Sequence, residues 1–161
     1  MSQERVLRDY FSDGKRRVAL LGVGNSMRGD DGVGPRIIEL LETRPIESVL
    51  LLNTQSVPEA FIGKVEEFKP THILLIDAAN FNGAPGETRL ITGEQIGGQA
   101  FSTHTLPLNI FIAYIEETLS VSVLLLAIQP LSVTLGKPMS EPVEAAANLV
   151  ADMLYEILSK K

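Results

Sequence analysis

Two adjacent acidic residues, Asp30 and Asp31, end a glycine-rich loop that follows a strand-like apolar run at residues 18–24. A loop that cradles phosphate avoids carboxylates because they repel the anion, so this loop is better suited to a cation. Two later residues could complete a cation site: Asp77, which ends a second apolar run, and His104, in a polar segment. Two carboxylates and one imidazole would leave open positions on a borderline divalent ion such as nickel or zinc. Asp31, Asp77 and His104 are therefore the candidate metal ligands and the candidate catalytic residues.

Each candidate also has a simpler interpretation. Asp30 or Asp31 could cap the first helix, which is a common use of aspartate. Asp77 could bond neighbouring loop amides, although an aspartate that closes a buried apolar strand favours a functional role. The setting of His104, in Ser-Thr-His-Thr-Leu-Pro at residues 102–107, could be plain helix-entry chemistry. We expect the metal site because the three residue types complement one another.

The other histidine, His72, cannot belong to the same site. It begins the strand that Asp77 ends. Five strand residues span about 16 Å, so His72 and Asp77 cannot share one metal ion. We therefore expect His72 to be structural or exposed, which leaves His104 as the usable histidine.

Strand-like and helical segments alternate along the chain, which predicts a parallel sheet covered on both faces. The fold class is α/β, a three-layer α/β/α sandwich with a twisted, mostly parallel sheet of about five strands. Residues 93–105 are expected to form a long loop at the site rather than a packed element. The expected strands are 17–24, 48–53, 72–77, 87–91 and 121–128. One expected helix begins near residue 35, and the others cover 58–68, 107–119 and 140–158, the last capped by Ser140.

In an open α/β sheet, sites form outside the carboxyl ends of the strands. Asp31 leaves the first expected strand and Asp77 ends the third, so their carboxylates can converge if these two strands are neighbours. His104 would reach them from the long loop.

Composition sets the broad class. The 161 residues fit a single domain, 1–161, with residues 1–16 as an extra N-terminal helix or arm before a domain at 17–158. The net charge of −6 argues against a nucleic-acid partner. The absence of cysteine removes thiolate ligands and suits a cytoplasmic protein. No apolar run reaches the roughly 18 residues of a membrane span, and nothing demands more than a monomer.

Nucleotide-binding signatures fail on their spacing. Gly22 and Gly24 follow a strand, but Met27 takes the place of the third glycine of a dinucleotide fingerprint. The second expected strand ends at Asn53-Thr-Gln55, without an acid for the ribose. There is no P-loop lysine and no G-x-S-x-G elbow. We expect no organic cofactor.

Short motifs spread in order over residues 17–158 match the pattern of a known family. They are Gly-Val-Gly-Asn-Ser-Met-Arg-Gly-Asp-Asp-Gly-Val-Gly-Pro at 22–35, and the segments 58–59, 69–78, 85–87, 103–109, 128–130 and 138–142. With these motifs the chain resembles the nickel–iron hydrogenase maturation endopeptidases. Within that family it is most similar to the branch that matures the large subunit of the formate-hydrogenlyase type of hydrogenase.

The resemblance implies an activity and a partner. Family members cut a short C-terminal extension from the hydrogenase large-subunit precursor once nickel has been inserted. The family's metal-contacting residues fall on Asp31, Asp77 and His104, although other branches carry glutamate in place of Asp31. We expect these residues to complete the coordination of nickel that the precursor supplies on its own cysteines.

Three alternatives stay open at this point. The first is a nickel-binding chaperone without hydrolysis, the second a dinucleotide-binding module, and the third a metalloprotease that carries its own metal. Which carboxylate acts as general base is also open.

Overall fold

The computed structural model describes residues 2–12, 14–96 and 107–160. They contain a five-stranded sheet with the order β2-β1-β3-β5-β4, in which β4 alone runs antiparallel to its neighbour. The first and third strands pair directly, as the convergence of Asp31 and Asp77 requires. The predicted mostly parallel sheet is confirmed. The strands are β1 (Val18–Val23), β2 (Val49–Gln55), β3 (His72–Ala78), β4 (Thr88–Thr92) and β5 (Val123–Ile128).

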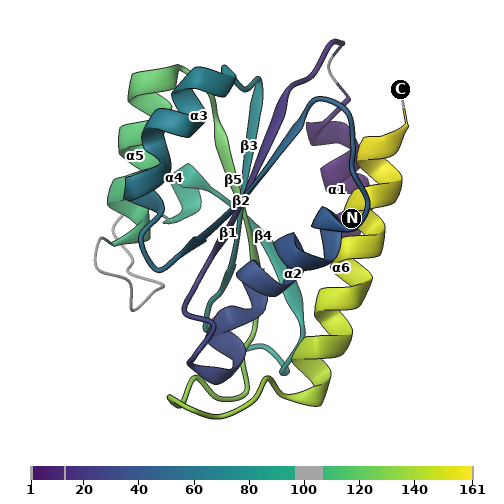
Figure 1. Ribbon diagram of the computed structural model, residues 1–161, viewed down its shortest axis with the longest axis vertical. Helices are drawn as coiled ribbons and strands as arrows, with labels where there is room; N and C mark the ends of the chain where they lie inside the picture. Colours follow the sequence, from purple (N-terminus) through teal and green to yellow (C-terminus); the bar gives the residue numbers. More distant parts are fainter. Residues whose placement is uncertain (1, 13, 97–106, 161) are drawn as a thin grey trace.

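Helices cover both faces of the sheet and give the three layers visible in Figure 1. One face carries α1 (Gln3–Tyr10), α2 (Val33–Glu42) and α6 (Glu141–Ser159). The other carries α3 (Ile62–Phe68), α4 (Gly93–Ile96) and α5 (Leu108–Leu119). Two short 3-10 turns, η1 (Gly29–Gly32) and η2 (Pro58–Phe61), follow β1 and β2. The predicted α/β/α sandwich is therefore confirmed.

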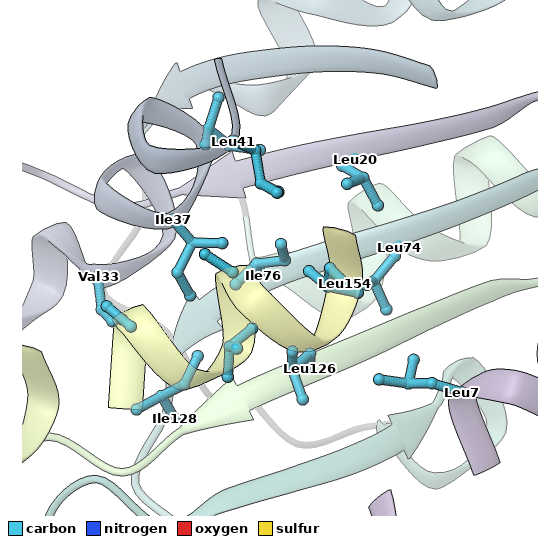
Figure 2. Packing of buried hydrophobic residues seen from close by; sticks show 14 of the residues in the cluster. Leu7, Leu20, Val33, Ile37, Leu41, Leu74, Ile76, Leu126, Ile128 and Leu154 are labelled. Atoms are coloured by element: carbon cyan, nitrogen blue, oxygen red, sulfur yellow. The ribbon is translucent and has the colours of Figure 1, made fainter. Parts of the chain in front are cut away.

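The central strands divide the core into two apolar clusters. Every residue of β1, β3 and β5 is buried, as expected for parallel strands that are covered on both faces. Because side chains alternate along a strand, Leu74 and Leu126 pack toward α1, α2 and α6 (Figure 2), whereas Leu75 and Leu125 pack toward α3 and α5. The sheet is thus a rigid platform for the loops at its ends.

The N-terminal extension is a helix that belongs to the core. Leu7 and Phe11 are fully buried against the sheet and α6. The Arg16 guanidinium donates hydrogen bonds to the carbonyl oxygens of Ile157 (3.1 Å) and Lys160 (2.6 Å) at the end of α6. Within residues 1–16, Gln3–Tyr10 form the helix α1.

His72 lies inside the fold, at the opposite end of β3 from Asp77. Its side chain is only 5% exposed and its ring packs edge-on against Tyr10, with ring centroids 5.0 Å apart. The hydroxyl group of Thr71 lies 2.7 Å from its Nδ1. The prediction of a structural His72 is confirmed.

Residues 93–96 correct the prediction of a loop over 93–105, because they form the short helix α4. Thr92 and Gln95 make a reciprocal capping box: the Gln95 N–H donates to Thr92 Oγ1 (3.2 Å), and the Thr92 N–H donates to Gln95 Oε1 (2.9 Å). This threonine-to-glutamine spacing is readable in the sequence. The rest of the expected loop lies outside the described residues.

The outer strand β4 is protected at its edge. The outward N–H of Leu90 donates to the side chain of Gln3 (3.0 Å), and that of Thr92 donates to Gln95. These two side chains therefore accept from backbone N–H groups with which an added strand would have to pair.

No helix in the described ranges is long and apolar enough to cross a lipid bilayer.

Candidate functional site

The loop after β1 folds back so that Asp31 lies against the strand end. Gly24 has φ of 141°, and a Cβ there would lie 1.8 Å from the carbonyl oxygen of Asp31, so only glycine fits. The Asn25 N–H donates to Asp31 Oδ2 at 2.8 Å. Asp31 is only 7% exposed, and no described residue donates a hydrogen bond to Asp31 Oδ1. One carboxylate oxygen is thus fixed by the protein and the other can serve a ligand.

Asp77 lies at the carboxyl end of the neighbouring strand. It is 1% exposed and stands beside Ala127 of β5. The first turn of α2 closes onto this strand end, because a Cβ on Gly34 would lie 2.2 Å from the carbonyl oxygen of Ile76. Because Gly34 has no side chain, the first turn of α2, which follows Asp31, can contact Ile76, which precedes Asp77. The structure places both predicted aspartates at the same edge of the sheet, and their role as ligands stays a prediction.

His104, the third predicted ligand, lies outside the described residues. The described chain resumes at Pro107, the residue before α5. In the ranges 2–12, 14–96 and 107–160, no group of three histidine, cysteine, aspartate or glutamate residues is arranged to hold a metal ion.

Asp30 does not cap α2, the helix that follows its loop, so the interpretation of Asp30 as a helix cap is wrong. Neither η1 nor α2 has a side-chain cap. The fully buried Asp30 carboxylate instead accepts backbone hydrogen bonds from Leu131 (2.8 Å), Ser132 (3.2 Å) and Ser140 (2.7 Å), and a fourth from the Ser140 hydroxyl group (2.8 Å). A buried charge needs such donors in place of water. Asp30 thus ties the β1–α2 turn to the loop between β5 and α6.

The same contacts correct the expectation that Ser140 caps α6. Ser140 does occupy the N-cap position, but its hydroxyl group donates to Asp30 rather than accepting from the helix. The interpretation of Asp31 as a helix cap is likewise wrong, because its carboxylate accepts from Asn25, which precedes it.

Gln55, at the end of β2, braces the other side of the Asp31 loop. Its carbonyl oxygen accepts from the Gly24 N–H (2.8 Å), and its side chain both accepts from the Ser26 N–H (3.1 Å) and donates to the Ser26 hydroxyl oxygen (3.0 Å). From the sequence, Gln55 was considered only as part of the strand end that lacks the acidic residue of a ribose-binding site. A polar residue that ends an apolar strand was the available signal.

Gln129 plays the equivalent part after β5 and was also missed. Its Oε1 accepts from the N–H groups of Phe81 (2.8 Å) and Gly83 (3.1 Å), which fixes the loop that leaves β3 two residues beyond Asp77.

The loop amides argue against a phosphate site. A phosphate cradle needs backbone N–H groups that point at the anion. Here the N–H of Asn25 is bonded to Asp31, that of Ser26 to Gln55, and that of Met27 to Asn25 Oδ1 at 2.9 Å. The turn satisfies its own donors and presents a carboxylate, as expected for a cation site.

Comparisons with known proteins identify the family. A family model described as hydrogenase maturation protease matches residues 35–157. The hydrogenase 3 maturation protease of Escherichia coli K12 is 37% identical over 136 residues, which cover 84% of this chain and 86% of that protein.

Solved structures give the same result. The crystal structure of a NiFe hydrogenase maturation protease, HycI from Thermococcus kodakarensis, has a TM-score of 0.88 and 38% identity, covering 96% of this chain and 99% of that chain. The solution structure of the endopeptidase HycI from Escherichia coli has a TM-score of 0.73 and 34% identity, covering 86% of this chain and 90% of that chain.

Proposed function

This chain belongs to the hydrogenase maturation protease family and is a peptidase, and from that premise we propose that it removes a C-terminal extension from the precursor of a hydrogenase large subunit. The observation that carries the proposal is that two buried carboxylates, Asp31 in the turn after β1 and Asp77 near the end of β3, lie beyond or at the carboxyl ends of two adjacent strands. Such a pair lies where α/β proteins place their sites. It can bind a metal-bearing segment and hold a water molecule against it.

The proposal includes nickel as a part of the substrate. Asp31, Asp77 and His104 would complete the coordination of a nickel ion that the precursor already holds on cysteines. Two observations support this: the chain has no cysteine of its own, and Asp31 keeps Oδ1 available while Oδ2 is fixed by Asn25. Carboxylate and imidazole ligands suit a borderline ion. A bound metal ion polarises a neighbouring carbonyl group, and the protein positions the scissile bond beside it.

The test mixes the purified chain with its large-subunit precursor, with and without nickel, and weighs the products by mass spectrometry. Loss of a short C-terminal peptide only from the nickel-loaded precursor is the expected result. Cleavage of both forms would contradict nickel recognition, and cleavage of the nickel-free form by zinc-loaded enzyme would identify a self-sufficient metalloprotease. Complex formation without cleavage would indicate a chaperone.

Substitution of either carboxylate tests its role. We expect Asp31→Ala and Asp77→Ala each to lower the cleavage rate by about 100-fold or more, the range associated with a lost acid–base or electrostatic group. Asp9→Ala is the matched control, because it removes an exposed carboxylate on α1. Circular dichroism checks that the variants fold. Cleavage at the wild-type rate by Asp31→Ala would remove that residue from the proposed site.

A further inference from the structure

Three large apolar side chains are exposed next to the candidate site. Met27 is 71% exposed, Leu131 is 62% exposed and Leu135 is 61% exposed, and we call this set the apolar rim. Single exposed apolar residues are normal on a protein surface. The apolar rim differs because its members come from two segments that are bonded to each other.

Hydrogen bonds join the two segments that carry the apolar rim. The carbonyl oxygen of Met27 accepts from the N–H of Gly136 at 2.8 Å, which places Met27 beside Leu135. The Asp30 carboxylate accepts from the N–H of Leu131 at 2.8 Å. In Figure 1 the loop between β5 and α6 accordingly runs along the bottom of the molecule, below the start of α2.

The loop between β5 and α6 is braced rather than loosely attached. The backbone N–H of Asp30 donates to the carbonyl oxygen of Ser132 at 2.9 Å, and the hydroxyl groups of Ser132 and Thr134 lie 2.9 Å apart. At its far end the loop is held by the two bonds from Ser140 to Asp30. A loop whose backbone is already ordered loses less conformational entropy when a partner binds, so more of the contact free energy is left for affinity.

We infer that the apolar rim docks an apolar segment of the hydrogenase large-subunit precursor and so presents the scissile bond to Asp31. This inference rests on the proposed function. The apolar rim is built on the same 3-10 turn as the site, because Asp30 holds Leu131 and is followed directly by Asp31. A protein that brings a peptide bond to Asp31 must approach this turn and so meets the apolar rim. The occupant is therefore the protein whose peptide bond must reach Asp31.

The test compares two rim variants with an exposed leucine elsewhere. Met27→Ser and the double variant Leu131→Ser/Leu135→Ser remove the apolar rim without touching a buried side chain. Leu149→Ser is the control, because Leu149 is 71% exposed but lies on α6. Direct binding to the nickel-loaded precursor is measured by calorimetry, KM and kcat are measured by cleavage, and the oligomeric state by light scattering.

We expect the double variant to weaken precursor binding and raise KM by about tenfold or more, as for apolar interface anchors, with kcat unchanged and Leu149→Ser equal to the wild type. Unchanged precursor binding in both rim variants would overturn the inference. So would a wild-type dimer that dissociates in the rim variants, because the occupant would then be a second copy. If the wild type binds the precursor without cutting it, the proposed function fails, and the binding data still decide the role of the apolar rim.

Discussion

Replacing Asp30 should destabilise the protein strongly, although Asp30 is not a candidate ligand. The carboxylate is fully buried and accepts four hydrogen bonds, three on Oδ2 and one on Oδ1. The perturbation of choice is Asp30→Asn, which keeps the shape and one oxygen acceptor. Whichever way the new amide is oriented, its NH2 group faces at least one N–H donor from the loop between β5 and α6.

The structure sets the magnitude. A hydrogen bond to a charged group contributes about 1.5–3 kcal/mol, and a buried group left unsatisfied costs about 1–3 kcal/mol. If the amide oxygen takes the Oδ2 position, only the Ser140 N–H loses its acceptor, so we expect Asp30→Asn to lower the free energy of unfolding by about 2 kcal/mol. Asp30→Ala removes every acceptor and should cost roughly 4 kcal/mol, a large part of a typical domain's stability.

Urea unfolding followed by circular dichroism measures these differences. Asp152→Asn is the control, because Asp152 is 64% exposed and its ion pair with Arg44 lies at the surface, where such pairs contribute about 0–1 kcal/mol. For a protein of this size, about 2 kcal/mol corresponds to a fall in Tm of roughly 4–8 °C. If Asp30→Asn stays within about 0.5 kcal/mol of Asp152→Asn, the buried carboxylate does not hold the loop and the reasoning is refuted.

Two further predictions concern the scaffold. Gly34→Ala puts a Cβ 2.2 Å from the carbonyl oxygen of Ile76, so it should cost about 3 kcal/mol or more in urea unfolding. Gly63→Ala, where the new Cβ meets nothing within 4 Å in helix α3, should instead stabilise by about 0.5–1 kcal/mol, and equal effects would contradict the close approach of α2 to β3. Burial raises the pKa of Tyr10 from 10.0 to about 12, so its neutral form stabilises the fold below pH 10 and that contribution is lost as the pH rises through 12. Tyr10→Phe should therefore flatten the fall in stability between pH 10 and 12, and an unchanged slope in denaturation measured across that range would contradict the assignment.

Most of the fold could be predicted from local pattern. Continuous apolar runs such as Ile73–Ile76 identified buried parallel strands, because strands covered on both faces carry apolar residues at every position. The last helix was predicted at 140–158 and is found at Glu141–Ser159, since the serine before its first turn and its apolar stripe are both local signals. The prediction failed at residues 93–96, where the Thr92–Gln95 capping box was overlooked.

The candidate site was predictable in part. Asp31 and Asp77 were chosen by chemistry and lie at one edge of the sheet, because adjacent parallel strands end together. The functions assigned to Asp30 and Ser140 were wrong for a different reason. Their partners lie about a hundred residues apart along the chain, and no local rule connects them.

Local sequence is enough to tell which residues form strands and helices, that the protein has no thiolate, and which carboxylates end a glycine-rich loop and an apolar strand. These properties depend on residue type and on neighbours within a few positions. Three further features are visible only in the folded chain: β1 and β3 are adjacent, Gly34 lets α2 approach Ile76, and Asp30 holds the loop between β5 and α6. Burial explains the role of Asp30. A carboxylate enclosed in the fold must accept hydrogen bonds from whichever donors the packing brings to it, whereas an exposed carboxylate is satisfied by water.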